Sequence, residues 1–300
     1  MADFPEARPP GEFRASAPAA GDPELVREAA RLLAGAARPL IIAGGGIKNA
    51  REHGRALALA ELLGAPVALS PGHGDAVPCE HPLYAGQVGP RGNAVASQLA
   101  READVLLALG TRLGFTTTFY TCDNLNPAAR IVHVDQEHAA VGRFFPVALG
   151  LVGDAGRIAG QLAAALGGHR PPAAAAAWTA AFREGRAKLL AEREATGSAR
   201  GDPIQPASLY HAIRKVAPAD AMFTMDAGTL CLQATDQMPY RTPPSLFTPL
   251  DFGLVGFSYA AGLGIKLACP GRTVVSLMGD GGFGMTVREI GTAVANGITT

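Results

Sequence analysis

The chain has 300 residues, of which 48% are hydrophobic, and its 26 acidic residues balance its 26 basic ones. This length and apolar content suffice for two ordinary cores, so we expect two domains. Because the charges cancel, the composition argues against binding to nucleic acid or to an anionic membrane. The sequence holds no run of 18 apolar residues and begins with no signal-peptide core, which indicates a soluble, cytoplasmic protein.

The four cysteines are widely spaced and form no CxxC pair, which argues against a zinc site or a disulfide framework. They are Cys79, Cys122, Cys231 and Cys269. We therefore expect reduced thiols, most of them buried.

Residues 1–22 are rich in Pro, Ala and Gly without a helical or strand period, so we predict a linker there. In residues 23–167, helical patterns alternate with short apolar runs. The predicted strands are 39–43, 66–69, 105–109, 130–134 and 149–152, and the later helices are 50–63, 93–103 and 155–166. This alternation predicts a doubly wound parallel sheet, which is an α/β, Rossmann-like domain.

Small or polar residues follow three of these predicted strands, and they include Gly45, Arg112 and Asp135. Ligands of such sheets bind at the carboxyl ends of the strands, so these three residues are candidate nucleotide contacts. The alternative is ordinary strand punctuation, because Gly44-Gly45-Gly46 does not complete a GxGxxG fingerprint. His133 lies inside an apolar strand, and we expect a buried histidine with a structural role.

Residues 168–203 begin as an Ala- and Pro-rich linker and continue as a charged helix with Trp178 and Phe182 on it. We predict that this helix bridges two domains. The second domain, 204–300, opens with a helix at Pro206 whose inward face is predicted to include Leu209 and Val216.

Two buried strands are predicted in this second domain, at 221–225 and 274–278, so it should be a second parallel-sheet domain. The first is followed closely by Gly228 and Thr229. The second runs into Gly279, Asp280, Gly281, Gly282 and Phe283, ahead of a helix predicted at 286–295. Glycines at such a turn let backbone NH groups approach a ligand, and the carboxylate of Asp280 suits a hard cation that bridges to a diphosphate. The stretch 237–249 gives no clear assignment.

A wider frame surrounds this turn: Asp251-Phe252-Gly253-Leu254-Val255-Gly256-Phe257, a small-residue helix at 258–268, the strand and the Gly-Asp-Gly. This frame resembles the diphosphate-binding domain of thiamine diphosphate (ThDP) enzymes of the acetolactate synthase type. The first half resembles the middle domain of the same enzymes through RPLIIAGGGI, HPLYAGQVGPRGN, ADVLLALGTRL and ARIVHVDQE.

The resemblance implies roles for individual residues. It makes Asp280 a Mg²⁺ ligand, Val255 the apolar residue that holds the cofactor bent, and Gly253 the residue whose carbonyl contacts the pyrimidine. The remaining implied cofactor contacts are Gly228, Thr229, Gly279, Gly281, Gly282 and Phe283. Some relatives hold FAD in the middle domain, others hold a different nucleotide and others hold nothing. Arg112 and Asp135 would be the diphosphate and ribose contacts.

In that family a pyrimidine-binding domain with an activating glutamate precedes the middle domain, and an Asn pair follows the Gly-Asp-Gly by about 25 residues. Neither feature is in these 300 residues. We therefore expect an incomplete second domain and a chain that is inactive alone. Many acetolactate synthases place Gln and His where this chain has Thr229 and Leu230.

The resemblance implies a ThDP- and Mg²⁺-dependent carboligase or decarboxylase, acting on a 2-keto acid or aldehyde, that forms a homodimer or homotetramer. The acetolactate synthase large subunit is the nearest pattern. The sulfoacetaldehyde acetyltransferase and glyoxylate carboligase branches share the frame and stay open as alternatives. A further alternative is a non-catalytic module, in which the first domain binds a nucleotide and the second only mediates association.

Overall fold

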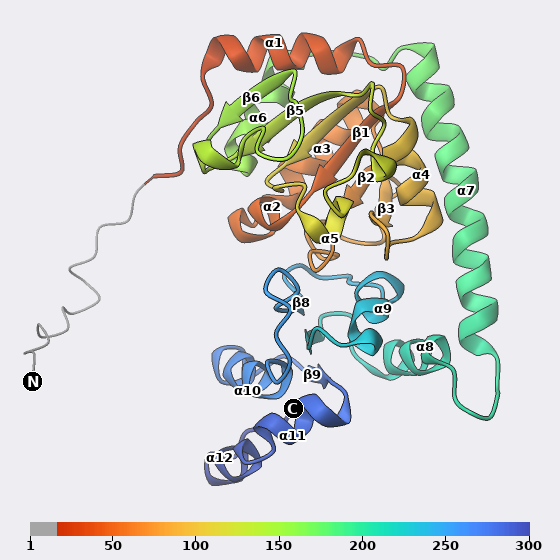
Figure 1. Cartoon of the computed structure of the whole chain (residues 1–300), viewed down its shortest axis with the longest axis vertical. Helices are drawn as coiled ribbons and strands as arrows, with labels where there is room; N and C mark the ends of the chain where they lie inside the picture. Colours follow the sequence, from red (N-terminus) through yellow and green to blue (C-terminus); the bar gives the residue numbers. More distant parts are fainter. Residues whose placement is uncertain (1–16) are drawn as a thin grey trace, which may run out of the picture.

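The computed structural model describes residues 17–300, so most of the linker predicted at 1–22 lies outside the described residues. Two parallel sheets, each with helices around it, are arranged one above the other in Figure 1. We call residues 23–166 the N-terminal unit and residues 206–295 the C-terminal unit. The predicted α/β class with two parallel sheets is confirmed. Within residues 17–300, no helix combines the length and apolar character needed to cross a membrane.

The N-terminal unit is built on six parallel strands in the order β3-β2-β1-β4-β5-β6. The strands are β1 (Pro39–Ala43), β2 (Val67–Leu69), β3 (Tyr84–Gln87), β4 (Val105–Leu109), β5 (Arg130–Asp135) and β6 (Leu149–Val152). Every residue of β1 and β4 is buried, as expected for strands that are covered on both faces. Because the chain order reverses between β1 and β4, a crevice opens at the carboxyl ends of these two strands.

Helices cover both faces of this sheet. One core is shared by α1 (Pro23–Ala34), α3 (His53–Leu63) and α6 (Ala155–Leu166). The opposite core takes side chains from α4 (Ala94–Glu102) and α7 (Ala173–Ser198). The loops contain the short helices α2 (Gly45–Ala50) and α5 (Phe115–Thr118) and two 3-10 turns, Cys122–Asn124 and His138–Ala140.

The helix predicted at 50–63 corresponds to α3, which begins at His53, and the unpredicted helix α2 precedes it. Arg51 adopts the left-handed conformation (φ 57°), and its NH group closes α2 on the carbonyls of Ile47 and Lys48. Helix α2 begins at Gly45, directly after its N-cap Gly44 and close to the end of β1. The glycine triplet did not predict a helix start there. This start of α2 is allowed because Gly46 packs directly on Gly110, where a Cβ would lie 2.6 Å from the neighbouring Cα.

Helix α7 spans 26 residues and extends from the first sheet to the C-terminal unit (Figure 1). Its first half is anchored on the N-terminal unit, since Phe182 is buried and the indole NH of Trp178 donates to the carbonyl of Pro39 at 3.0 Å. Its second half packs against α8 (Pro206–Val216).

The C-terminal unit is built on three parallel strands in the order β8-β7-β9. They are β7 (Met222–Met225), β8 (Leu246–Phe247) and β9 (Val274–Leu277), and β8 lies in the stretch that the sequence left unassigned. The helices after α8 are α9 (Thr229–Gln237), α10 (Ser258–Ala268), α11 (Asp280–Thr286) and α12 (Glu289–Ala295). The chain goes from β7 to β8 on one side and then to β9 on the other. The crevice of this sheet is therefore at the carboxyl ends of β7 and β9.

The helix predicted at 286–295 is found as α12, which begins at Glu289, and the unpredicted helix α11 precedes it. Helix α11 already begins at Asp280, with Gly279 as its N-cap and a hydrogen bond of 3.0 Å from the NH of Phe283 to the carbonyl of Gly279. Three glycines make a poor helix by propensity, but tertiary contacts override that preference here. The glycine-rich turn is thus the first turn of a helix and not an open loop.

The inward face of α8 also differs from the prediction. Val216 is 84% exposed and Leu209 is 38% exposed, whereas Tyr210 and Arg214 are buried. The Arg214 guanidinium lies over the ring of Phe223, 5.1 Å from its centroid. A long basic side chain thus covers the core strand where an apolar side chain was expected.

A buried carboxylate of the N-terminal unit holds the edge of the second sheet. Asp75 is fully buried and accepts hydrogen bonds from the backbone NH groups of Ser245 (2.8 Å) and Leu246 (2.9 Å), at the start of β8. Its other oxygen lies 3.1 Å from Nζ of Lys48. The charge of Asp75 is therefore compensated, and β8 is fixed to the N-terminal unit.

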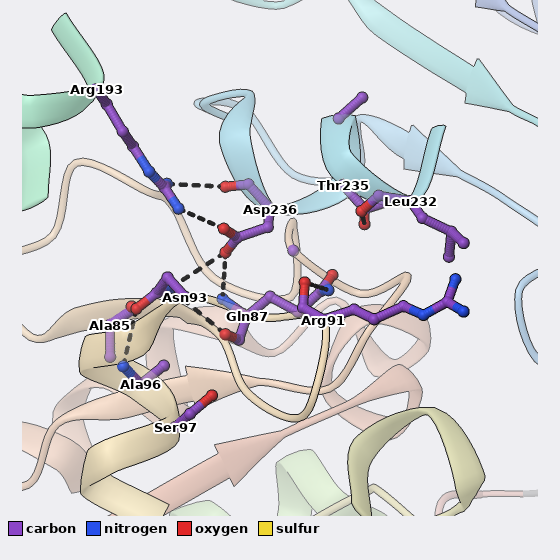
Figure 2. A network of polar contacts seen from close by, with 12 residues as sticks. Ala85, Gln87, Arg91, Asn93, Ala96, Ser97, Arg193, Leu232, Thr235 and Asp236 are labelled. Atoms are coloured by element: carbon purple, nitrogen blue, oxygen red, sulfur yellow. Dashed lines mark hydrogen bonds and ion pairs between the residues drawn. The ribbon is translucent and has the colours of Figure 1, made fainter. Parts of the chain in front are cut away.

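A second buried carboxylate joins the units from the other direction. Asp236, in the last turn of α9, accepts hydrogen bonds from the NH of Gln87 (3.2 Å) and from Nδ2 of Asn93 (3.1 Å). Arg193 of α7 pairs with its other oxygen and donates to its carbonyl at 2.9 Å. Figure 2 shows the side chains of Arg193 and Asn93 and the backbone NH of Gln87 meeting at Asp236.

Candidate functional site

The carboxyl ends of β7 and β9 carry the most distinctive chemistry of the C-terminal unit. Asp226 follows β7 and is only 2% exposed. Its Oδ1 accepts a hydrogen bond from the NH of Ser258 (2.7 Å), and its Oδ2 accepts one from the NH of Gly256 (3.0 Å). The carboxylate is compensated by these NH groups, and it fixes the loop that leads into α10.

Gly282 brings α11 against the same carboxylate. A Cβ at this position would lie 2.0 Å from Oδ2 of Asp226 and 3.4 Å from Cγ1 of Val255. No other residue type fits without moving the helix or the loop. The turn after β9 and the loop before α10 therefore meet at Asp226.

The loop itself needs glycine at two positions. Gly253 (φ 73°) and Gly256 (φ 85°) both lie in the left-handed region, which side chains disfavour. The NH of Gly253 donates to the carbonyl of Pro249 at 2.8 Å, and the NH of Ala227 donates to the carbonyl of Leu254 at 3.2 Å. This backbone leaves Val255 between the glycines with 41% of its surface exposed.

Other glycines around this crevice have no packing reason to be glycine. A Cβ at Gly228, Gly253, Gly279 or Gly281 would meet no surrounding protein atom within 4 Å. Gly228 is the N-cap of α9, and the first residue of that helix is the exposed Thr229. Open backbone faces at the starts of α9 and α11 suit a ligand that carries negative charge and approaches closely.

Asp280 and Phe283 both lie on α11. Asp280 is exposed in the first turn, and the half-exposed ring of Phe283 meets Tyr259 of α10 edge-on, with 5.7 Å between centroids. Within residues 17–300, no three His, Cys, Asp or Glu side chains form a group that could hold a metal. A divalent cation at Asp280 could take phosphate oxygens, waters or backbone carbonyls as further ligands, and Mg²⁺ in proteins commonly keeps such ligands.

Asp226 is the residue that the sequence analysis missed as a site residue. The signal was present, because a carboxylate directly after a buried apolar strand is out of place in a core. Its partners, however, lie 30 and 32 positions further along the chain.

A second candidate site lies at the crevice of the first sheet. Gly45, Arg112 and Asp135 line one cavity of about 380 Å³ at the ends of β1, β4 and β5. The structure therefore brings the three predicted nucleotide contacts together. Nη2 of Arg112 lies 3.5 Å from Oδ2 of Asp251, a residue of the C-terminal unit. His73, and to a smaller extent Arg112, hold the pKa of Asp251 below its ordinary value.

His133 belongs to neither site. It is 3% exposed, its Nδ1 accepts from the NH of Gly142 (3.2 Å) and its Nε2 meets the carbonyl of Thr111 (3.0 Å). Because Nδ1 accepts, the proton must be on Nε2, which donates. Burial lowers the pKa of the ring and so favours this neutral form. The expected structural histidine is confirmed.

Comparison with known proteins agrees with this division of the chain. The family described as "Thiamine pyrophosphate enzyme, central domain" matches residues 26–162. The family described as "Thiamine pyrophosphate enzyme, C-terminal TPP binding domain" matches residues 226–300, a range that begins at Asp226, directly after β7, and contains β9, α10 and α11.

Curated relatives are similar over nearly all of the chain. A sulfoacetaldehyde acetyltransferase from Castellaniella defragrans is 33% identical over 302 residues, which cover 93% of this chain and 50% of the relative. An acetolactate synthase from Mycobacterium bovis is 31% identical over 275 residues, covering 91% of this chain and 44% of the relative. The chain thus spans about half the length of these relatives.

A solved structure shows the same fold. It is assigned to a thiamin diphosphate-dependent enzyme from Mycobacterium smegmatis, and it covers 97% of this chain with a TM-score of 0.75 at 23% identity. The match extends over 55% of that protein. With both of its units matched in order, the chain belongs to the thiamine pyrophosphate enzyme family.

Proposed function

We propose that this chain provides the diphosphate- and Mg²⁺-binding part of a ThDP-dependent enzyme that acts on a 2-keto acid or an aldehyde. The observation that carries the proposal is the meeting of Asp226, Gly282 and Val255 in the crevice between β7 and β9, inside the matched cofactor-binding region. Acetolactate synthase-like carboligation or decarboxylation is the corresponding chemistry.

The residues present fit the cofactor. Open backbone at Gly228, Gly279 and Gly281 leaves space for a diphosphate, and Asp280 offers a carboxylate to the cation that would neutralise it. When bound, ThDP supplies a carbon nucleophile and an electron sink for the bond next to a carbonyl. The protein's part is to bind and orient this group.

Val255 and Gly253 are proposed to orient the middle of the cofactor. Val255 lies between Gly253 and Gly256, whose backbones are in the left-handed conformation. The loop is fixed by the hydrogen bond from the NH of Gly256 to Asp226. Cγ1 of Val255 faces Gly282, where an added Cβ would lie 3.4 Å away, and 41% of the residue is exposed and available for an apolar contact. Because the loop is already fixed, no conformational entropy has to be lost to position this contact when the reaction takes place.

A second candidate concerns the substrate. The relative named sulfoacetaldehyde acetyltransferase is 33% identical, slightly above the acetolactate synthase at 31%. Thr229 also departs from the Gln of many acetolactate synthases. We therefore propose sulfoacetaldehyde as the first aldehyde to assay beside pyruvate.

We also propose that the 380 Å³ cavity of the first sheet takes a nucleotide, with Arg112 and Asp135 as polar contacts. Arg112 would have to exchange Asp251 for a phosphate, and both side chains are more than half exposed, so the exchange costs little. An absorbance spectrum of the purified protein tests FAD, and mass spectrometry of the denatured supernatant tests other nucleotides.

Self-association is part of the proposal. The C-terminal unit exposes several large apolar side chains, which are Phe252, Leu254, Met285, Ile290 and Val294. Such residues gathered on one unit are typical of an interface between protein molecules. Light scattering coupled to gel filtration measures whether the chain forms a dimer or a tetramer.

The direct test is calorimetric titration of the chain with ThDP in the presence of Mg²⁺. Asp280→Ala is expected to abolish Mg²⁺-dependent binding, because the diphosphate loses the cation that offsets its charge. Asp123→Ala removes a carboxylate from the N-terminal unit that is also exposed, and serves as the matched control. Equal affinity in both variants would remove Asp280 from the site.

A further inference from the structure

A large cavity lies away from both crevices, where the two units meet beside α7. It has a volume of about 1050 Å³, opens to solvent and is lined by α7, α8, the end of α9 and the segment around β3. Its walls carry charged side chains of both signs: the basic ones are Arg186, Arg193, Arg214, Arg241, Lys215 and His211, and the acidic ones are Glu80, Glu192, Glu194 and Asp236.

Two of these arginines are neutralised by carboxylates in the wall. Arg193 pairs with Asp236, as Figure 2 shows, and Nε of Arg241 lies 3.1 Å from Oε1 of Glu80. In each pair one carboxylate balances one guanidinium group. Asp236 and Glu80 are therefore not available to balance the charge of Arg186 or Arg214.

Arg186 and Arg214 have only neutral partners among residues 17–300. Arg186 donates to the carbonyl of Cys79 at 2.8 Å, and Arg214 donates to the carbonyl of Pro218 at 2.9 Å. Arg214 is 7% exposed, and its Nε is buried without a hydrogen-bond partner. Burial lowers the pKa of both guanidinium groups, which is the sign of a charge that has lost water and gained no counter-ion. A buried donor without a partner costs free energy, so an acceptor bound near Nε of Arg214 would be stabilising.

The cavity is suited to binding and not to reaction. Cys79 is its one thiol among the lining residues, and burial raises the pKa of that thiol to about 11 even though Arg241 and Arg186 act in the opposite direction. At neutral pH the sulfur stays protonated and is a poor nucleophile. A reactive cysteine is therefore not the reason for the nearby arginines.

One more unpaired group faces the same region. His211, one turn before Arg214 on α8, has a buried Nε2 without a partner, while its Nδ1 lies 3.6 Å from Glu194. Its unpartnered Nε2 adds a third polar nitrogen to the wall. Groups from two helices can contact an oxyanion from two sides, which groups on a single helix cannot do.

We propose that this cavity binds a small molecule carrying a phosphate or another oxyanion, held by Arg186 of α7 and Arg214 of α8 with His211 beside them. Such a ligand would connect α7 to the C-terminal unit, because its two arginine contacts come from different helices. The site is separate from the ThDP crevice, and the proposal does not depend on the proposed function.

The test is calorimetric titration of the full chain with inorganic phosphate, with sodium chloride at matched ionic strength as the reference. Saturable binding is expected, and Arg186→Met is expected to weaken it about tenfold or more, the usual effect of losing one charge-assisted hydrogen bond. Arg183→Met, on the same helix but exposed and outside the cavity, is the matched control.

Arg214→Lys serves as the second variant, since it keeps the charge over Phe223 and removes the planar donor set. Weaker phosphate binding with an unchanged melting temperature supports the assignment. Asp280→Ala should bind phosphate normally, which separates this cavity from the ThDP site. Absence of saturable binding to the unmodified chain, or equal affinities for Arg186→Met and Arg183→Met, would overturn the proposal.

Discussion

The two sheets use glycine at their carboxyl ends for opposite purposes. In the first sheet, Gly44 and Gly46 lie against Gly110, where added Cβ atoms would come within 2.7 Å and 2.6 Å of its backbone. In the second sheet, Gly228 and Gly281 have open space at the same position. The first set lets two turns pack together beside the cavity of the first sheet, and the second set leaves backbone open to the crevice of the second sheet. Glycine after a strand therefore indicates close backbone approach by a ligand only where no protein atom fills the space of its missing side chain.

Gly46→Ala tests the packed set and should have the largest effect. A methyl group would collide with the backbone of Gly110, which cannot rotate away, so we expect a loss of about 2 to 3 kcal/mol in the free energy of unfolding. Urea denaturation measures it. Gly54→Ala, in a helix with open space, should be neutral or slightly stabilising. Similar losses in both variants would show that packing on Gly110 is not the cause.

Asp226→Asn tests what holds the open crevice in shape. The amide has only one oxygen, so one of the NH groups of Gly256 and Ser258 loses its acceptor, at a cost of about 1 to 3 kcal/mol. Asp280→Asn, a change of the same chemistry at an exposed position, should leave the unfolding free energy unchanged. Denaturant titration of the two variants in parallel decides the matter, and a stable Asp226→Asn protein would refute the role of Asp226.

Gly281→Ala tests the open set. The methyl group meets no protein atom, so stability should not fall, yet it would occupy the space proposed for the diphosphate. We expect ThDP affinity to drop about tenfold, equivalent to about 1.4 kcal/mol. Calorimetry with Mg²⁺ measures the affinity and thermal unfolding measures the stability. Unchanged affinity would mean that the cofactor does not approach this backbone.

The smallest expected effect concerns pH and His133. Burial lowers the pKa of its ring, so the unfolded chain takes up the proton more readily than the folded protein. The stability from the neutral ring is complete above the unfolded-state pKa of about 6.5 and is lost as the pH falls from there through the lower folded value. His133→Gln should flatten this part of the curve of melting temperature against pH. An unchanged slope would contradict the assignment.

Much of the fold could be predicted because its strands are short apolar runs that end at small residues. The runs at 105–109 and 149–152 and the helix at 258–268 are found at the predicted bounds. Elements that depend on distant contacts were missed. Helix α11 forms on glycines where Gly282 packs on Asp226, and Asp75 fixes the start of β8 through the NH groups of Ser245 and Leu246.

The same reason explains what was missed in the sites. The residues around Gly253 and Gly279 were found because they follow one another in a recognisable order. The carboxylate of Asp226 and the arginines of the α7–α8 cavity belong together only in space. Arg186 and Arg214, for example, come from separate helices, and each resembles an ordinary surface residue in the sequence.

The buried carboxylates at the junction also bear on how this protein can be divided for expression. Asp75 and Asp236 each sit on one unit and find their hydrogen-bond donors on the other or on α7. A cut through the segment 168–203 would leave both charges without these donors, and would free the edge strand β8 as well. Shorter pieces should therefore keep α7 and both units together, or replace Asp75 and Asp236 by uncharged residues before the halves are separated.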